Sequence, residues 1–242
     1  MRPTPHPTLD QIRDADHALV RTVDALPDES YAQPTLLPGW TRGHVLAHLA
    51  LNAEGLARVL TGAHIGEART MYDSQDDRDQ DIEDLAAEGP SRVRERLLGS
   101  TTTFEQAVRS MHTADWADRF ERTPGGQQIA VASAPLMRWR EVHIHHADLG
   151  ADYGSDDWPD DFTVRLIESM AAFDDSEPFV VRATDLDRSW QLGQADTTGG
   201  SPGTTGPVVS GRAAALGWWL TGRGSGEGLV SDSGSLPRIA SW

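Results

Sequence analysis

The stretch that decides the fold is residues 140–150, REVHIHHADLG. Its pattern is typical of a helix, and it places Glu141 and His145 four residues apart. Side chains with this spacing lie one above the other on the same helix face, so the carboxylate and the imidazole can converge on one point. Gly150 stands where a helix C-cap is expected. The stretch therefore predicts a helix that presents two metal-binding side chains together.

A second predicted helix, residues 41–60, carries His44 and His48 at the same spacing. One imidazole from this helix would complete a set of two histidines and one carboxylate. Three protein ligands with an open position are typical of a catalytic metal site rather than a structural one. His143 and His146 point elsewhere on their helix and are weaker candidates. The remaining histidines show no supporting pattern and are expected to be structural: His6, His17, His64 and His112.

The pair of Glu141 and His145 also has a simpler interpretation, a hydrogen-bonded pair on a solvated helix face. Three apolar neighbours indicate instead that the helix is partly buried: Leu136, Val142 and Leu149. A buried carboxylate without a partner is costly, so Glu141 is expected to be paired or metal-bound.

Helical patterns dominate the first 150 residues. Apolar side chains recur at near-3.6 spacing in four segments, so we expect helices at 9–26, 41–60, 91–111 and 133–150. Thr41, Ser91 and Ser133 are the expected N-caps. The acidic stretch 70–90 between the second and third helices is expected to be a loop. Four helices of this length predict an up-down bundle, and bundle cores hold metals between facing helices.

The remainder of the chain has a different pattern. A turn-rich junction at 154–159 precedes an amphipathic helix around 162–173 and a helix at 212–220. Short strands are expected at 179–183, 189–192 and 207–210, with an exposed hairpin loop at 196–206. The predicted fold class is therefore α+β, with a helical bundle over residues 1–155 and a smaller α+β domain over 156–242.

Composition narrows the possible partners. A formal net charge of −16 argues against binding to nucleic acid, whose phosphates would be repelled. The sequence has no run of 18 apolar residues and no apolar leader segment, which predicts a cytoplasmic protein without a membrane span. It also has no cysteine, so any thiol that takes part in its chemistry must arrive on a small molecule. The oligomeric state stays open, with a monomer as one option.

Residues 39–48, GWTRGHVLAH, followed by Asn52, resemble the N-terminal metal-binding motif of mycothiol-dependent maleylpyruvate isomerases. Four further segments are similar to that family, in the same order along the chain: Met71 and Tyr72 with Arg78, residues 140–150, residues 209–211 and residues 222–225. The resemblance implies a DinB-like four-helix bundle followed by a smaller α+β domain. His44 is not a ligand in the family's pattern.

The resemblance implies that Zn²⁺ is bound by His48, Glu141 and His145. It also places Arg78 and Arg223 near the substrate or the thiol, as catalytic and cofactor-binding residues. Each arginine has an alternative interpretation. Arg78 could balance charge inside an acidic loop, and Arg223 could be a cation that the macrodipole favours at a helix C-terminus.

The implied activity is the cis-trans isomerisation of maleylpyruvate to fumarylpyruvate. In this reaction the thiolate of mycothiol, activated by zinc, adds to the double bond, the new single bond rotates, and elimination returns the thiol. Three alternatives stay open at this point. They are a mycothiol S-transferase acting on another electrophile, a non-catalytic metal-stabilised binding module, and an Fe(II) oxygenase with two histidines and one carboxylate. The oxygenase is disfavoured because that chemistry normally occurs in β-barrels.

Overall fold

The computed structural model describes residues 7–172, 177–193 and 206–239. The chain divides into two compact units, Met1–Gly154 and Ser155–Trp242, and each is described here by itself. His6 and residues 196–205 of the expected hairpin loop lie outside the described residues.

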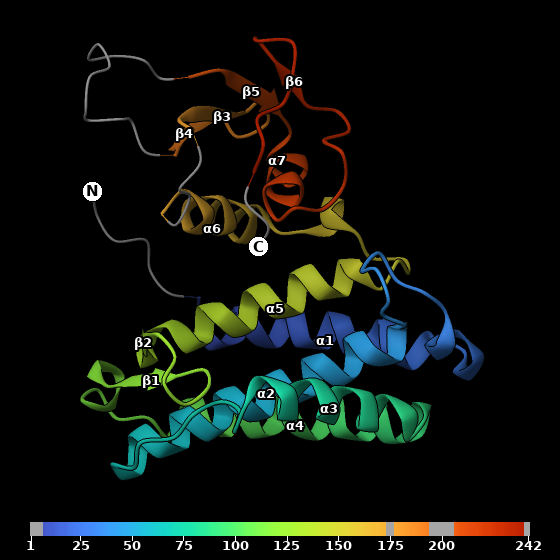
Figure 1. The fold of residues 1–242 in the computed structure, drawn as a ribbon, viewed down its shortest axis with the longest axis vertical. Coiled ribbons are helices and arrows are strands. Elements are labelled where there is room, and N and C mark those ends of the chain that lie inside the picture. The colour runs from blue at the N-terminus through green and yellow to red at the C-terminus, as the bar shows by residue number, and fades with distance from the viewer. Residues whose placement is uncertain (1–6, 173–176, 194–205, 240–242) are drawn as a thin grey trace. The chain divides into compact units, whose positions relative to one another are not determined.

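The first unit is built around four long helices: α1 (Leu9–Ala25), α2 (Arg42–Ile65), α4 (Pro90–Ser110) and α5 (Ala134–Asp148). Figure 1 shows α5 lying along α1, with α2 between them and α4. The apolar stripes anticipated from the sequence are buried: for example, Leu19 of α1, Leu56 of α2 and Phe104 of α4 are at most 1 % exposed. The predicted α+β class with its helical bundle is confirmed.

The expectation that the acidic stretch 70–90 is a loop is wrong. It contains a further helix, α3 (Gln75–Ala87), which packs against α2. Ser74 caps it by accepting a hydrogen bond from the backbone N–H of Asp77 at 2.9 Å. Ile82 and Leu85 are its buried residues. A helix with so few apolar positions shows little periodicity in the sequence, and the cap and the contact with α2 define it instead.

One N-cap prediction in this unit also needs correction. Helix α4 begins at Pro90 with Gly89 as its N-cap, so Ser91 lies inside the helix. Ser133 is the N-cap of α5 as predicted, although its side chain makes no capping hydrogen bond. A proline at the first position of α4 fits because that residue's N–H would have no intrahelical partner.

A small hairpin that the sequence did not predict lies between α4 and α5. Strand β1 (Arg119–Glu121) pairs antiparallel with β2 (Gln128–Ala130), and 3₁₀ helices, η2 (Asp115–Ala117) and η3 (Val131–Ser133), flank the hairpin. The backbone N–H groups of Met71 and Tyr72 donate to the carbonyls of Glu121 and Arg122 at 3.2 and 3.0 Å. The hairpin therefore fixes the segment that carries Tyr72.

A fully buried arginine joins three helices of the bundle. Arg138 of α5 is 0 % exposed, donates to the backbone carbonyl of Leu49 on α2 at 2.8 Å, and donates to the carboxylate of Asp16 on α1 at 2.7 Å. Burial raises the pKa of Asp16, although the neighbouring guanidinium opposes this. The pair therefore costs desolvation energy, but it fixes the position of α5 against α1 and α2.

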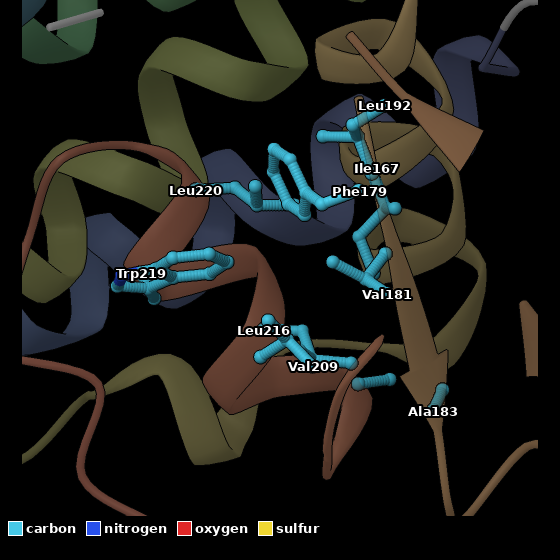
Figure 2. Packing of buried hydrophobic residues seen from close by; sticks show 10 residues of the cluster. Ile167, Phe179, Val181, Ala183, Leu192, Val209, Leu216, Trp219 and Leu220 are labelled. Atoms are coloured by element: carbon cyan, nitrogen blue, oxygen red, sulfur yellow. The ribbon is translucent and has the colours of Figure 1, made fainter. Parts of the chain in front are cut away.

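The second unit contains a four-stranded sheet of order β4-β3-β5-β6. Its strands are β3 (Phe179–Ala183), β4 (Arg188–Leu192), β5 (Val208–Gly211) and β6 (Val230–Ser231), and its helices are α6 (Asp160–Ala171) and α7 (Ala213–Leu220), with a 3₁₀ turn η4 (Ser155–Asp157). β3 and β5 are parallel, and the other pairs are antiparallel. Figure 2 shows the core, where Phe179 and Val181 of the sheet pack with Leu216 and Trp219 of α7. In the part of the chain that is described, no helix is long and apolar enough to cross a bilayer.

Candidate metal centre

Helix α2 brings His48 into the interior of the first unit. Thr41 caps this helix: its hydroxyl accepts from the backbone N–H of His44 at 3.4 Å, and its own N–H donates to the His44 ring at 3.2 Å. The second ring nitrogen of His44 is 3.0 Å from a carboxylate oxygen of Glu83 on α3. Both ring nitrogens of His44 therefore contact groups at the start of α2 and on α3. His48, one turn later, is 4 % exposed and faces α5.

Helix α5 supplies the carboxylate and the second imidazole. The Oε2 atom of Glu141 is 2.8 Å from Nε2 of His48 and 3.3 Å from Nε2 of His145. The two imidazole rings are nearly perpendicular, with centroids 4.8 Å apart. One carboxylate oxygen therefore lies between two ring nitrogens that come from different helices. The three residues expected to bind zinc come together, with one potential ligand atom of each within 4.8 Å of the others.

Behind His145 lies a carboxylate that the sequence analysis did not single out. The Oδ2 atom of Asp148 is 2.8 Å from Nδ1 of His145, and Asp148 is 0 % exposed. A carboxylate in this position holds a proton on Nδ1 of His145 and directs Nε2 toward Glu141. The i, i+3 spacing of His145 and Asp148 on one helix face was the available sequence signal.

His48 has a cation behind its ring instead. A terminal nitrogen of Arg78 is 3.0 Å from Nδ1 of His48, and the other terminal nitrogen is 2.6 Å from a carboxylate oxygen of Asp79. A guanidinium only donates hydrogen bonds, so Nδ1 of His48 accepts and the ring proton lies on Nε2, toward Glu141. Arg78 is placed at the site by α3, not by the acidic loop that was expected.

The protonation states of the group follow from burial and hydrogen bonding. Burial lowers the pKa of His48 to about 4, although its bond to Glu141 opposes this. Burial raises the pKa of Glu141, but the hydrogen bonds from His145 and His48 outweigh this and hold it well below its ordinary value. Burial also lowers the pKa of His145, but the bonds to Asp148 and Glu141 outweigh it and raise the net value. Glu141 is therefore ionised and His48 neutral at pH 7. Metal binding through Nε2 of His48 also requires the ring proton to move to Nδ1, which means that Arg78 must give up its contact with that nitrogen.

The donor set suits a borderline transition metal. Imidazole nitrogens with one carboxylate oxygen are typical ligands of zinc, whereas magnesium and calcium prefer sites made of oxygen atoms. Three ligands leave a coordination position open for a thiol or water. Asp148 supplies the outer hydrogen bond that metal-binding histidines usually make. The residues present therefore fit zinc.

A cavity of about 170 Å³ adjoins Arg78. Tyr72, Met71, Gly55 and Arg58 contribute to its lining, and the Arg78 guanidinium lies 5.7 Å from the centre of the Tyr72 ring. The aromatic ring of Trp40 contacts His48 edge-on, with centroids 5.6 Å apart. Trp40 and Arg78 therefore flank His48, and Arg78 also contributes to the lining of the cavity.

Arg223, the other arginine expected at the site, belongs to the second unit. It follows α7 and donates a hydrogen bond to the carbonyl of Thr221 at 3.0 Å, with its guanidinium 5.8 Å from the ring centre of Trp218. These contacts fit the alternative interpretation of a cation at a helix end, and its role toward substrate or thiol stays a prediction.

The expectation that His64 and His112 have no supporting constellation is wrong. They form a second group with Asp115 in which one potential ligand atom of each residue lies within 4.8 Å of the others. Its members come from separate segments without a shared helical pattern, so periodicity gave no signal for it.

The fold and the first site together define a helical-bundle protein with a candidate centre of two histidines and one carboxylate. The family described as "Mycothiol maleylpyruvate isomerase N-terminal domain" matches residues 12–150. This chain belongs to that family.

Among solved structures, the chain is similar to a crystal structure of the mycothiol-dependent maleylpyruvate isomerase, with 26% identity and a TM-score of 0.85. The match covers 97% of this chain and 95% of that one. A variant of that enzyme, with one histidine replaced by alanine, matches over the same shares with 26% identity and a TM-score of 0.84. No curated protein matches the chain.

Proposed function

We propose that this protein is a mycothiol-dependent maleylpyruvate isomerase whose zinc is held by His48, Glu141 and His145. The observation that carries the proposal is the meeting of these side chains between α2 and α5, with buried Asp148 behind His145. Similarity over nearly the whole chain to a solved mycothiol-dependent maleylpyruvate isomerase supports it.

The chemistry needs a good nucleophile that is also a good leaving group. Zinc in this group would stabilise a bound thiol as its thiolate, whereas a free thiol with a pKa of about 8.5 is mostly protonated at neutral pH. Because the chain has no cysteine, a small molecule must supply that thiol, and membership of the family favours mycothiol. Addition of its thiolate to the cis double bond, bond rotation and elimination would give fumarylpyruvate without net oxidation or reduction. Hydroxide is a poor leaving group and would hydrate the double bond instead.

The chain's own residues bind and orient the reactants. Arg78 presents its guanidinium beside the cavity and is suited to hold a substrate carboxylate through two parallel hydrogen bonds. Burial raises the pKa of Tyr72, so its hydroxyl stays protonated and can donate to the enolate oxygen that forms during addition. Trp40 excludes water from one side of His48. We assign Arg223 to a second anionic group of the substrate or the thiol.

The test is conversion of maleylpyruvate by the purified protein with and without mycothiol. We expect no turnover without the thiol, and full turnover with a substoichiometric amount that is recovered unchanged. His48→Ala should lose the zinc of this group and, with it, the activity. His44→Ala is the matched control because this histidine lies one turn earlier on the same helix and contacts Thr41 and Glu83 instead. It should keep its zinc.

Other outcomes of these experiments would assign the protein a different function. Consumption of one thiol per turnover would favour a mycothiol S-transferase. A protein that binds zinc but converts no electrophile in the presence of mycothiol would be a metal-stabilised binding module. Turnover at full rate without thiol would refute the mechanism, and a zinc content of His48→Ala equal to that of the wild type would refute the ligand set.

A further inference from the structure

The second cluster of metal-binding side chains lies at the far end of α2 from His48. His64 is in the last turn of α2, His112 follows the end of α4, and Asp115 begins η2. The Oδ2 atom of Asp115 is 3.0 Å from Nδ1 of His64 and 3.9 Å from Nδ1 of His112. The two imidazole rings meet edge to face with centroids 4.8 Å apart. Three segments of the chain thus direct two imidazoles and one carboxylate toward one point.

Hydrogen bonding alone accounts for only part of this arrangement. The contact of His64 with Asp115 is a hydrogen bond, but the 3.9 Å between the His112 ring and Asp115 is too long for one. Backbone bonds hold the two residues of the turn instead. The N–H of His112 donates to Oδ2 of Asp115 at 2.8 Å, and the N–H of Asp115 donates to the carbonyl of His112 at 3.1 Å. These bonds place the His112 imidazole beside the carboxylate without using its ring nitrogens.

The spacing of the three groups fits a shared ion. Ligand atoms bound tetrahedrally at 2.0–2.1 Å from zinc are about 3.3 Å from one another. The two measured separations from Oδ2 of Asp115, 3.0 and 3.9 Å, lie on either side of that value. The His112 side chain is 77% exposed and can rotate to shorten the longer one, whereas Asp115 is 14% exposed and held in place.

We infer that His64, His112 and Asp115 form a second binding site for a divalent transition metal, such as Zn²⁺, separate from the group at His48. Two imidazoles and one carboxylate select borderline metals over magnesium or calcium. Sixteen residues of α2 separate His48 from His64, or about 24 Å along the helix, so the two groups cannot share an ion. An ion at the second site ties the end of α2 to the connection between α4 and β1. The inference does not depend on the proposed function.

The test is the zinc stoichiometry of the full chain, measured by equilibrium dialysis and elemental analysis. We expect two zinc ions per wild-type chain and one for His112→Ala, whose exposed side chain can be removed without disturbing the core. His64→Ala should also bind one. His17→Ala is the matched control because His17 is an exposed histidine of α1 outside both groups. It should keep two ions.

Combination with His48→Ala separates the two sites. His48→Ala alone should retain one ion, and His48→Ala with His112→Ala should retain none. If wild type and His112→Ala bind the same number of zinc ions, the second site does not exist, whatever the result at His48. If His48→Ala keeps the wild-type count while His112→Ala loses one ion, the second site stands and the proposed catalytic ligand is wrong.

Discussion

Replacing Asp148 with asparagine tests whether the hydrogen bond behind His145 prepares that ring for a metal. The bond is 2.8 Å long and wholly buried, and it joins a carboxylate to an imidazole N–H. A hydrogen bond to a charged group contributes about 1.5–3 kcal/mol, which corresponds to about a 10- to 100-fold change in affinity. Asparagine keeps the shape and an acceptor oxygen but loses the charge. We therefore expect about 10-fold weaker zinc binding in Asp148→Asn and about 100-fold in Asp148→Ala.

Competition with a chromophoric zinc chelator at pH 8 measures this loss. Circular dichroism and the melting temperature of each metal-free variant show whether the bundle is intact. Asp152→Asn is the matched control, since it removes an exposed carboxylate just beyond the same helix. If Asp148→Asn binds zinc as tightly as Asp152→Asn, the buried carboxylate does not prepare His145 and the argument from the outer hydrogen bond fails.

Three further predictions concern Arg78 at the site, Arg223 of the second unit and a buried tyrosine. Arg78→Gln should lower turnover yet bind zinc about threefold to tenfold more tightly, because the substitution removes a positive charge and a hydrogen-bond donor that faces Nδ1 of His48. Weaker zinc binding in the chelator competition would contradict this. Arg223→Ala should lower turnover about 10- to 100-fold at unchanged zinc content, with Arg223→Lys restoring only part, since lysine lacks the planar fork; unchanged kinetics would reduce Arg223 to a helix-end cation. Burial raises the pKa of Tyr31 from 10.0 to about 12. The contribution of its protonated hydroxyl to the free energy of unfolding is therefore fully present below pH 10 and is lost as the pH rises toward 12. Denaturant unfolding at pH 9 to 12 should show Tyr31→Phe losing less stability than wild type, by up to about 3 kcal/mol; parallel pH profiles would exclude this.

The sequence predicted the parts of the fold that depend on local periodicity. The pairing of Glu141 with His145 needs only one helix, and the start of α2 needs only Thr41, so both could be anticipated. Helix α3 was missed because six of its 13 residues are acidic and only Ile82 and Leu85 are buried. Its contact with α2, rather than its own pattern, makes it a helix.

The candidate site was predictable only in part, for a related reason. Which histidine of α2 faces Glu141 depends on how far that helix is rotated about its axis. The sequence pattern of one helix by itself does not determine this rotation. The family resemblance, not the spacing, selected His48 over His44. The group of His64, His112 and Asp115 was missed because backbone bonds in a turn, rather than a helical repeat, bring its members together.

The buried Arg138 has a consequence for protein engineering. It holds the carbonyl of Leu49, the residue after His48, and it lies one turn before Glu141 on the other helix. Copying the three ligands alone onto another helical bundle would therefore omit the Arg138 contact, which fixes the position of the two helices along their axes. Replacing Arg138 and Asp16 with a well-packed apolar pair would be expected to leave the fold as stable or more so. The same exchange would release the ligand-bearing helices from a fixed register, so a more robust scaffold would be a less selective metal binder.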